Sequence, residues 1–441
     1  MSREMKRANL PCEEYIPQSW ETPRLKDNAY FINGDRGKNY PSGEDIKTEG
    51  VPFLTSDNIH GSTVDIARDG VKYITEEKYN SMHGAKLRIN DLIYCLRGSI
   101  GLCALNKELT QGTIASSLVV IRPKATVIPE FLNYVMNSAV IQQQNNNYTN
   151  GSCAANLSAE NVRNYNMPFP QIEEQKAIVS FLSIHCTYVD SAISKHQQII
   201  EKLEEYRKAV ITQTVTKGLN PNVEMKDSGV NWIGEIPASW TMTRVKFLGT
   251  YRNGLTYTPD DVCAEDEGVL VLRSSNIQNG KISLSDNVYV SCDIKDDLMV
   301  RNGDILICSR NGSADLIGKN ALINNLKATY GAFMMVFRPY CNSKYMYYVL
   351  NSNIFENNKA AFMTSTVNQL TANIFGNMAI PYCPDSDEQV QIAEYLDEKC
   401  ERIDSMISQH NQLISKLQEY KQSLIYNAVT GKIDCTTEAS A

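Results

Sequence analysis

The strongest pattern in this chain is a seven-residue repeat of apolar positions within two long, otherwise polar segments. In residues 172–216 the apolar positions recur at alternating steps of four and three, and residues 387–432 repeat them. A period of 3.5 residues favours helices that pack on one another as a left-handed coiled coil. The predicted seam comprises Leu182, Val189, Ile193, His196, Ile200 and Leu203 in the first helix and Leu396, Ile403, Ile407, His410, Ile414 and Leu417 in the second.

These helices are too long to be covered by small domains of their own. A helix of about 40 residues is roughly 60 Å long, so pairing the two stripes is the simplest way to bury them. The alternative is an ordinary amphipathic helix on a domain surface. Two matching stripes in one chain count against this alternative. His196 and His410 share one seam level. We interpret them as register-setting polar residues rather than a metal site or pH switch, because no carboxylate or cysteine recurs there.

The rest of the chain is also duplicated. The motif Ile-Pro-x-Ser-Trp at residues 16–20 returns at residues 236–240, and each copy ends in one of the long helices. Apolar runs bounded by turn residues, such as residues 90–95 and 302–308, predict buried strands of a mixed α/β (α+β) domain. The predicted division is a first domain over 1–171, its helix over 172–216, a linker over 217–235, a second domain over 236–386, its helix over 387–432, and a tail over 433–441.

Composition narrows the class of protein. The net charge is −7, which counts against a non-specific nucleic-acid coat but not against a locally basic face. The 12 cysteines include no C-x-x-C pair, so they are interpreted as core residues in a reducing compartment. The five histidines lack metal-ligand spacing, and no metal or cofactor is expected. No apolar run approaches the length of a membrane-spanning helix and no signal peptide is recognised, which predicts a cytoplasmic protein.

Catalytic motifs are absent or weak. We find no phosphate-binding P-loop, no amino-methyltransferase box and no glycine-rich loop for a nucleotide cofactor. Asp385 with Asp397, Glu398 and Lys399 resembles a nuclease constellation, which requires its acids and lysine to converge on a metal. A solvated helix face is the favoured interpretation, because the first copy has Ser-Ile-His at residues 183–185 instead.

The boundary motifs carry a family resemblance. Besides Ile-Pro-x-Ser-Trp, the run over residues 157–175 recurs over 370–389, and a heptad helix follows each. This combination resembles the specificity (S) subunit of Type I restriction–modification systems over nearly the whole chain. Two departures are visible: Tyr-Cys-Pro at residues 382–384 replaces a proline-rich apolar stretch, and the first copy lacks the lead-in found at residues 226–235.

The resemblance implies a function without catalysis. Two target-recognition domains would each read one half of a split, asymmetric site in double-stranded DNA, and an antiparallel coiled coil would set the distance between them. Two methyltransferase subunits would dock on the chain, and two ATP-dependent restriction/translocase subunits would join through them. Half-sites on one face of B-DNA lie about one helical turn apart, roughly 34–36 Å, or a multiple of it, which a rigid helix pair can set.

Three loops in each domain are candidates for DNA contact. Arginine suits guanine edges and phosphates, and amide- and hydroxyl-rich loops suit adenine and phosphates. Ordinary turn chemistry is the alternative for all of them. The candidates are Ser56 and Asn58, Arg97 and Ser99, and Asn150, Ser152 and Asn156 in the first domain; Arg273, Ser274 and Asn276, Arg310, Asn311 and Ser313, and Thr364, Thr366 and Gln369 in the second.

Two other functions remain open from the sequence. One is a DNA nuclease or methyltransferase whose catalytic part is not recognisable by motif. The other is a coiled-coil scaffold that makes no DNA contact.

Overall fold

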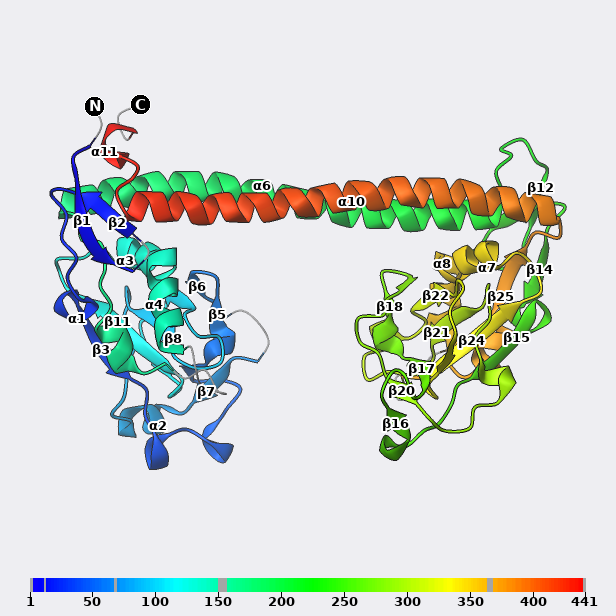
Figure 1. The fold of residues 1–441 in the computed structure, drawn as a ribbon, viewed down its shortest axis with the longest axis horizontal. Helices are drawn as coiled ribbons and strands as arrows, with labels where there is room; N and C mark the ends of the chain where they lie inside the picture. Colours follow the sequence, from blue (N-terminus) through cyan, green and yellow to red (C-terminus); the bar gives the residue numbers. More distant parts are fainter. Residues whose placement is uncertain (1–2, 12, 67–69, 150–156, 363–367, 439–441) are drawn as a thin grey trace. The chain divides into compact units, whose positions relative to one another are not determined.

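The computed structural model describes residues 3–11, 13–66, 70–149, 157–362 and 368–438 (Figure 1). The chain divides into two compact units, residues 1–196 with 412–441 and residues 197–411. The two long helices are α6 (Ile172–Lys217) and α10 (Ser386–Val429). Each unit therefore contains one α/β domain together with part of each long helix.

The first domain is built on a six-stranded sheet. Its strand order is β3 (Ala29–Asn33), β11 (Leu118–Pro123), β8 (Leu92–Cys95), β9 (Cys103–Leu105), β6 (Thr63–Val64) and β5 (Ile59–His60). A second sheet has the order β10 (Thr113–Ile114), β4 (Val51–Leu54) and β7 (Lys72–Ile74). The helices are α1 (Leu25–Asn28), α2 (Glu76–Ser81), α3 (Pro129–Met136), α4 (Ala139–Thr149), α5 (Ala159–Arg163) and α11 (Cys435–Glu438).

The second domain repeats this plan. One sheet has the order β15 (Gly249–Asn253), β24 (Met334–Pro339), β21 (Ile305–Cys308) and β22 (Asn320–Leu322). Another has the order β16 (Val262–Cys263), β20 (Tyr289–Val290), β17 (Val269–Leu272) and β23 (Ala328–Tyr330). Short pairs are β14 (Thr241–Arg244) with β25 (Ala379–Tyr382), and β18 (Ile277–Gln278) with β19 (Lys281–Ile282). The helices are α7 (Ser343–Leu350), α8 (Asn353–Phe362) and α9 (Ala372–Asn377).

The central strands show why the two copies share a fold. All four residues of β8 and all four of β21 are buried, as expected for continuous apolar runs covered on both faces. In each copy the strand pairs antiparallel with the one that ends in Arg-Pro, β11 or β24. The proline then stops the strand, because it cannot donate to a further ladder bond.

A buried ion pair is repeated at this position in both copies. Asp91 and Asp304 are each 1% exposed at the side chain and accept bidentate hydrogen bonds from Arg122 and Arg338, respectively, at 2.7–2.8 Å. The hydrogen bonds that Arg338 donates to Asp304 raise the pKa of the arginine. Each pair ties the turn before the central strand to the end of its neighbour.

Removing one partner of this pair should destabilise the second domain. Asp304→Ala leaves the Arg338 guanidinium without its partner, and breaking a buried pair in this way costs about 3–5 kcal/mol. Asp297→Ala is the matched control, because Asp297 and its partner Arg252 are both about half exposed and such pairs contribute about 0–1 kcal/mol. The free energy of unfolding, measured by denaturant titration, should separate the two variants. Equal values would show that the buried pair is not a stabilising element.

The repeated boundary motifs join each domain to its long helix. Both Trp20 and Trp240 are fully buried, and their Nε1 atoms donate to Glu174 at 2.7 Å and Glu388 at 3.2 Å. The next residue in each helix is a buried glutamine whose Oε1 accepts a backbone N–H of its own domain, at 2.9 Å for Gln175 and at 3.0 Å in the second copy. The motifs seen in the sequence are thus architectural contacts.

The start of α6 and the end of α10 meet at the same tryptophan in the first unit. Glu174 near the start of α6 accepts the Trp20 hydrogen bond, and Gly431 just after α10 lies against Trp20 and Pro17. The helices therefore run antiparallel there, and Lys421 pairs with Asp190 at 2.7 Å. In the second unit Arg207 pairs with Asp404 at 3.4 Å. The predicted fold class, two pseudo-repeated α/β domains with an antiparallel pair of long helices, is confirmed.

The predicted seam residues are less exposed than their neighbours along both helices. Leu182 and Val189 are buried in the first unit, and Leu396 and Ile403 are buried in the second. The remaining positions of the predicted seam are half-buried: Ile193, His196, Ile200, Leu203, Ile407, His410, Ile414 and Leu417. The stripe is therefore continuous along one face of each helix.

The first copy does have a counterpart of the lead-in at residues 226–235. Strands β1 (Met5–Leu10) and β2 (Glu13–Pro17) pair with Met5 opposite Pro17, and β12 (Met225–Asp227) and β13 (Glu235–Pro237) pair with Met225 opposite Pro237. The first copy lacks the sequence motif of the lead-in, but different residues form a hairpin with the same pairing there. The predicted linker over 217–235 thus contains a hairpin.

Within the part of the chain that the structure describes, one helix is apolar enough to cross a membrane by length and composition. It is α6, so the expectation that no segment of this chain reaches that level is corrected. Its apolar residues Phe181, Leu182 and Cys186 belong to the core cluster of the first unit. Its apolar window is 22% buried, and α6 is interpreted as an amphipathic helix whose apolar stripe packs on the first domain and pairs with α10.

Candidate nucleic-acid interface

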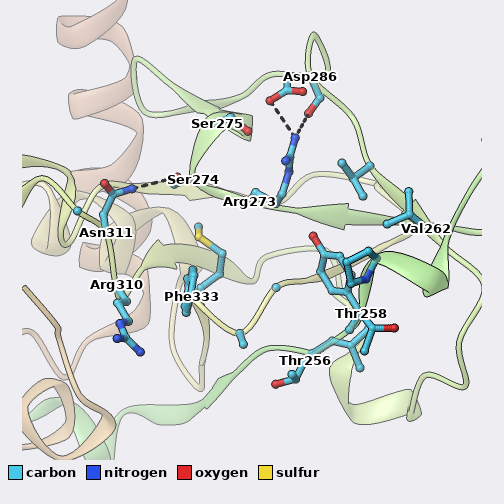
Figure 2. Close-up of a pocket in the computed structure, with 18 of the residues that line it drawn as sticks. Thr256, Thr258, Val262, Arg273, Ser274, Ser275, Asp286, Arg310, Asn311 and Phe333 are labelled. Carbon is cyan, nitrogen blue, oxygen red and sulfur yellow. Dashed lines mark hydrogen bonds and ion pairs between the residues drawn. The ribbon is translucent and has the colours of Figure 1, made fainter.

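The second domain has a cleft of about 1480 Å³ into which the three predicted loops converge (Figure 2). Arg273 and Ser274 follow β17, Arg310 and Asn311 follow β21, and Gln369 precedes α9. These segments are far apart in the sequence, and the parallel pairing of β17 with β23 helps to bring them to one end of the domain. Thr364 and Thr366 lie outside the described residues.

The loop after β17 is shaped by a buried asparagine. Asn276 is fully buried; its Oδ1 accepts the N–H of Arg273 at 2.9 Å, and its Nδ2 donates to the carbonyls of Ser283 and Asp286 at 3.0 Å. The guanidinium of Arg273 pairs with the Asp286 carboxylate at 2.8 Å. The Nε of Arg273 is buried with no hydrogen-bond partner among the described residues. Asn276 therefore holds the loop, and the buried Nε of Arg273 is left without a partner among the described residues.

The loop after β21 is tied to the other two loops. Asn311 Nδ2 donates to Ser274 Oγ at 3.2 Å, as Figure 2 shows, and its Oδ1 accepts the N–H of Ser313 at 3.1 Å. Arg310 forms a β-bridge with Gln369. The three loops therefore form one hydrogen-bonded surface, in which Arg310 and Ser313 are exposed and Ser274, Asn311 and Gln369 are half-buried.

Phe333 is a feature of this cleft that the sequence interpretation missed. It lies directly before β24, is 60% exposed, and has the guanidinium of Arg310 5.3 Å from its ring centroid. Cys308, the last residue of β21, is buried close to the loop that carries Arg310. Burial raises the pKa of its thiol, so the thiol stays neutral and packs as a core residue. Nothing in the local pattern around Phe333 distinguishes it from a core aromatic, and only its exposure does.

The first domain places its candidates at equivalent positions. Asn58 is buried, and its Oδ1 accepts the N–H of Thr55 at 2.8 Å, so it shapes the loop after β4 as Asn276 does after β17. Arg97 and Ser99 are exposed after β8, separated by Gly98 with a φ of 73°, a left-handed conformation that favours glycine. Ser56 is half-buried. Asn150, Ser152 and Asn156 lie outside the described residues.

A basic groove of about 600 Å³ lies elsewhere on the first domain. It runs along the edge strand β3, and its exposed Tyr30 has the Lys124 ammonium 5.2 Å from the ring centroid. No carboxylate lines it within the described part of the chain, although the net charge of the protein is negative. The five cations that line it come from four separate segments, which is why no charge run revealed it: Lys26, Arg88, Arg122 with Lys124, and Arg163.

The nuclease-like residues of the second copy are engaged separately. Asp385 accepts the N–H groups of Asp387 and Glu388 and so caps α10, whereas Asp397 accepts from Lys344 and Tyr348. The Lys399 ammonium lies over the ring of Tyr395. Three groups with three different partners do not form a common metal site, which favours the helix-face interpretation.

These features define a class of protein: two related α/β domains with polar loop surfaces, joined by paired helices. The model of the Type I restriction modification DNA specificity domain matches residues 17–205 and 237–418. The chain belongs to this family, as its boundary motifs predicted, and it is a specificity subunit of the Type I restriction–modification class.

Relatives and a solved structure agree with this assignment. The specificity subunit of the Type I restriction enzyme MjaVIII from Methanocaldococcus jannaschii is 24% identical, over 95% of this chain and 94% of its own. The StySPI specificity subunit from Salmonella potsdam is 19% identical, over 95% and 90%. A solved chain from a study of complex assembly and conformational transition in the type I R-M system superposes with a TM-score of 0.70 at 18% identity, covering 95% of this chain and 99% of that one; it supports the fold.

Proposed function

We propose that this chain reads a bipartite, asymmetric site in double-stranded DNA, one half-site with each domain, and carries no catalytic centre of its own. One observation carries the proposal. In both copies an exposed arginine, Arg97 or Arg310, stands two residues beyond a fully buried central strand. The strands beneath the two arginines pair in the same way in both domains, while the residues around the arginines differ. Two readers of different half-sites require this combination.

The chemistry of the loops suits base reading. A guanidinium on a short, fixed loop can donate two hydrogen bonds to guanine O6 and N7 in the major groove. The amide and hydroxyl groups of Asn311, Ser313 and Gln369 lie on the same surface and suit adenine and phosphate contacts. Asn58 and Asn276 are assigned the role of shaping their loops, since their side chains are committed to backbone partners.

The paired helices are proposed to set the spacing and to help to dock partners. Two methyltransferase subunits would bind the chain, and restriction/translocase subunits would join through them, in the cytoplasm. The names of the relatives as subunits of restriction enzymes support this proposal. No cofactor is assigned to this chain. Two competing functions remain: an enzyme with a catalytic centre, and a scaffold that makes no DNA contact.

The deciding experiment maps methylated positions in the genome of the host and then tests the deduced site with purified protein. The chain together with its methyltransferase partner should shift a duplex that carries both half-sites, and the chain by itself should neither cleave nor methylate it. Cleavage or methylation by the isolated chain would establish an enzyme. A complex that shifts no duplex would establish a scaffold.

The basic groove along β3 is proposed to contact the phosphate backbone outside the reading loops. Arg88→Gln, which removes the charge, should weaken binding of every duplex to a similar degree, because phosphates carry no sequence information. The slope of log affinity against log salt should fall by about one for each phosphate that is no longer neutralised. Arg88→Lys, which keeps the charge, is the control. Weakening confined to certain half-site sequences would show instead that Arg88 reads bases.

A further inference from the structure

Phe333 distinguishes the second reader from the first. The carbonyl of Phe333 accepts the N–H of Ser309 at 3.0 Å, and the carbonyl of Ser117 accepts the N–H of Leu96 at 2.9 Å. The two residues thus occupy the same place, directly before β24 and β11. The first domain has a small hydroxyl there, whereas the second has an aromatic ring that is 60% exposed.

The backbone of Phe333 is held in place beside Arg310. The Phe333 carbonyl accepts three hydrogen bonds, from the N–H groups of Ser309 and Arg310 at 3.0 Å each and from Ser309 Oγ at 2.9 Å. The Arg310 guanidinium lies over its face at 5.3 Å, a favourable cation–π contact. A single exposed apolar residue needs no explanation by itself. This one is anchored beside the candidate base-reading arginine and lines the same cleft.

We propose that Arg310 and Phe333 act together as a reader of a two-base step, in which the arginine takes guanine and the ring contacts the C5 methyl group of a thymine in the adjacent base pair. The inference rests on the proposed function of this cleft. Adjacent base pairs stack about 3.4 Å apart, and the Phe333 ring centroid lies 5.3 Å from the Arg310 guanidinium, so an arginine in the plane of one pair places the ring on the side of the adjacent pair. Apolar contact with the thymine methyl is an established mode of major-groove reading.

The first domain lacks this second element. Ser117 offers a hydroxyl in place of the ring, so Arg97 would read its guanine without an apolar neighbour at this position. The half-site read by the second domain should therefore contain a thymine whose methyl group contributes to affinity, and the equivalent position of the other half-site should show no such dependence.

The test uses the complex of the full chain with its methyltransferase partner and the mapped site. Each thymine of the half-site that Arg310→Ala impairs is replaced in turn by uracil, which removes only the methyl group. At one position wild-type affinity should fall about fourfold, the value for one buried carbon group. Phe333→Ser should bind the thymine and uracil duplexes equally, and Phe333→Leu, which keeps an apolar contact, should still distinguish them.

The outcomes separate this inference from the proposed function. Normal binding of the mapped site without any uracil effect, or a half-site that contains no thymine, overturns the reader step and leaves the two-domain proposal standing. If Phe333→Ser weakens binding but keeps the same thymine-to-uracil ratio as the wild type, the ring acts as a wedge between bases and not on the methyl group. Failure of the wild-type complex to bind the mapped site overturns the proposed function itself. A free energy of unfolding of Phe333→Ser equal to that of the wild type, measured by denaturant titration, verifies that the second domain is folded in the variant.

Discussion

Replacement of Arg310 by alanine should weaken recognition of one half-site by roughly 5- to 100-fold and leave the other half-site unchanged. A good bidentate arginine–guanine contact contributes about 1–3 kcal/mol of discrimination against a wrong base, and every 1.4 kcal/mol is a factor of ten. Arg310 is exposed, and its backbone lies in a β-bridge, so truncation of the side chain removes the contact without removing support for the loop. Binding to duplexes in which one half-site at a time is randomised measures the effect.

Arg97→Ala is the reciprocal variant and should impair only the opposite half-site. Arg301→Ala serves as a control, because Arg301 is an exposed arginine of the same domain outside the residues that line the cleft. If Arg97→Ala and Arg310→Ala impair the same half-site, the assignment of one reader to each domain is wrong. If both weaken binding of every sequence equally, the arginines contact phosphates.

Insertion of seven residues into α6 and seven into α10 should change the preferred spacing of the half-sites and neither half-site sequence. Seven residues preserve the heptad seam and lengthen each helix by roughly 10 Å. The original site could then engage only one reader at a time, and without simultaneous engagement the affinity falls by about 10²-fold or more. A library of duplexes with variable spacers, selected by the complex, identifies the new optimum.

A variant with seven exposed α6 residues replaced, at unchanged length, controls for altered helix chemistry. It should retain the original spacer. A lengthened protein that still selects the original spacer would show that the helices do not set the distance. Selection of a new half-site sequence would show instead that the insertions disturbed a reading domain. The hydrogen bonds of the buried Trp20 and Trp240 to the two helices argue against that outcome, because they fix each domain to its helix.

Local periodicity explains what could be predicted from the sequence. The heptad of Leu182, Val189 and their counterparts is visible because a helix places residues of one face at fixed intervals. The buried strands before Arg97 and Arg310 are visible because a continuous apolar run bounded by turn residues has few alternatives. Asp91 with Arg122 was not predicted, since 31 residues separate the partners and only the antiparallel pairing of β8 with β11 brings them together.

The candidate site was only partly accessible to prediction. The positions of Arg273, Arg310 and Gln369 in three loops followed from turn residues after strands, but the sequence could not tell a reading asparagine from a supporting one. Asn276 and Asn311 have the same donors and acceptors. Burial and backbone partners commit the first to its own loop, whereas the second links two loops at the cleft.

By itself, the sequence determined the duplication, the two long heptad helices and the boundary motifs, because each is a local pattern of residue types. Tertiary structure decided which residues meet: the strands of the hairpin at residues 5–17, the basic groove assembled from four segments, and Phe333 with Arg310. Contacts between distant segments depend on the pairing and packing of whole elements. A residue's burial and partners, and therefore its role, are settled only when those elements have come together.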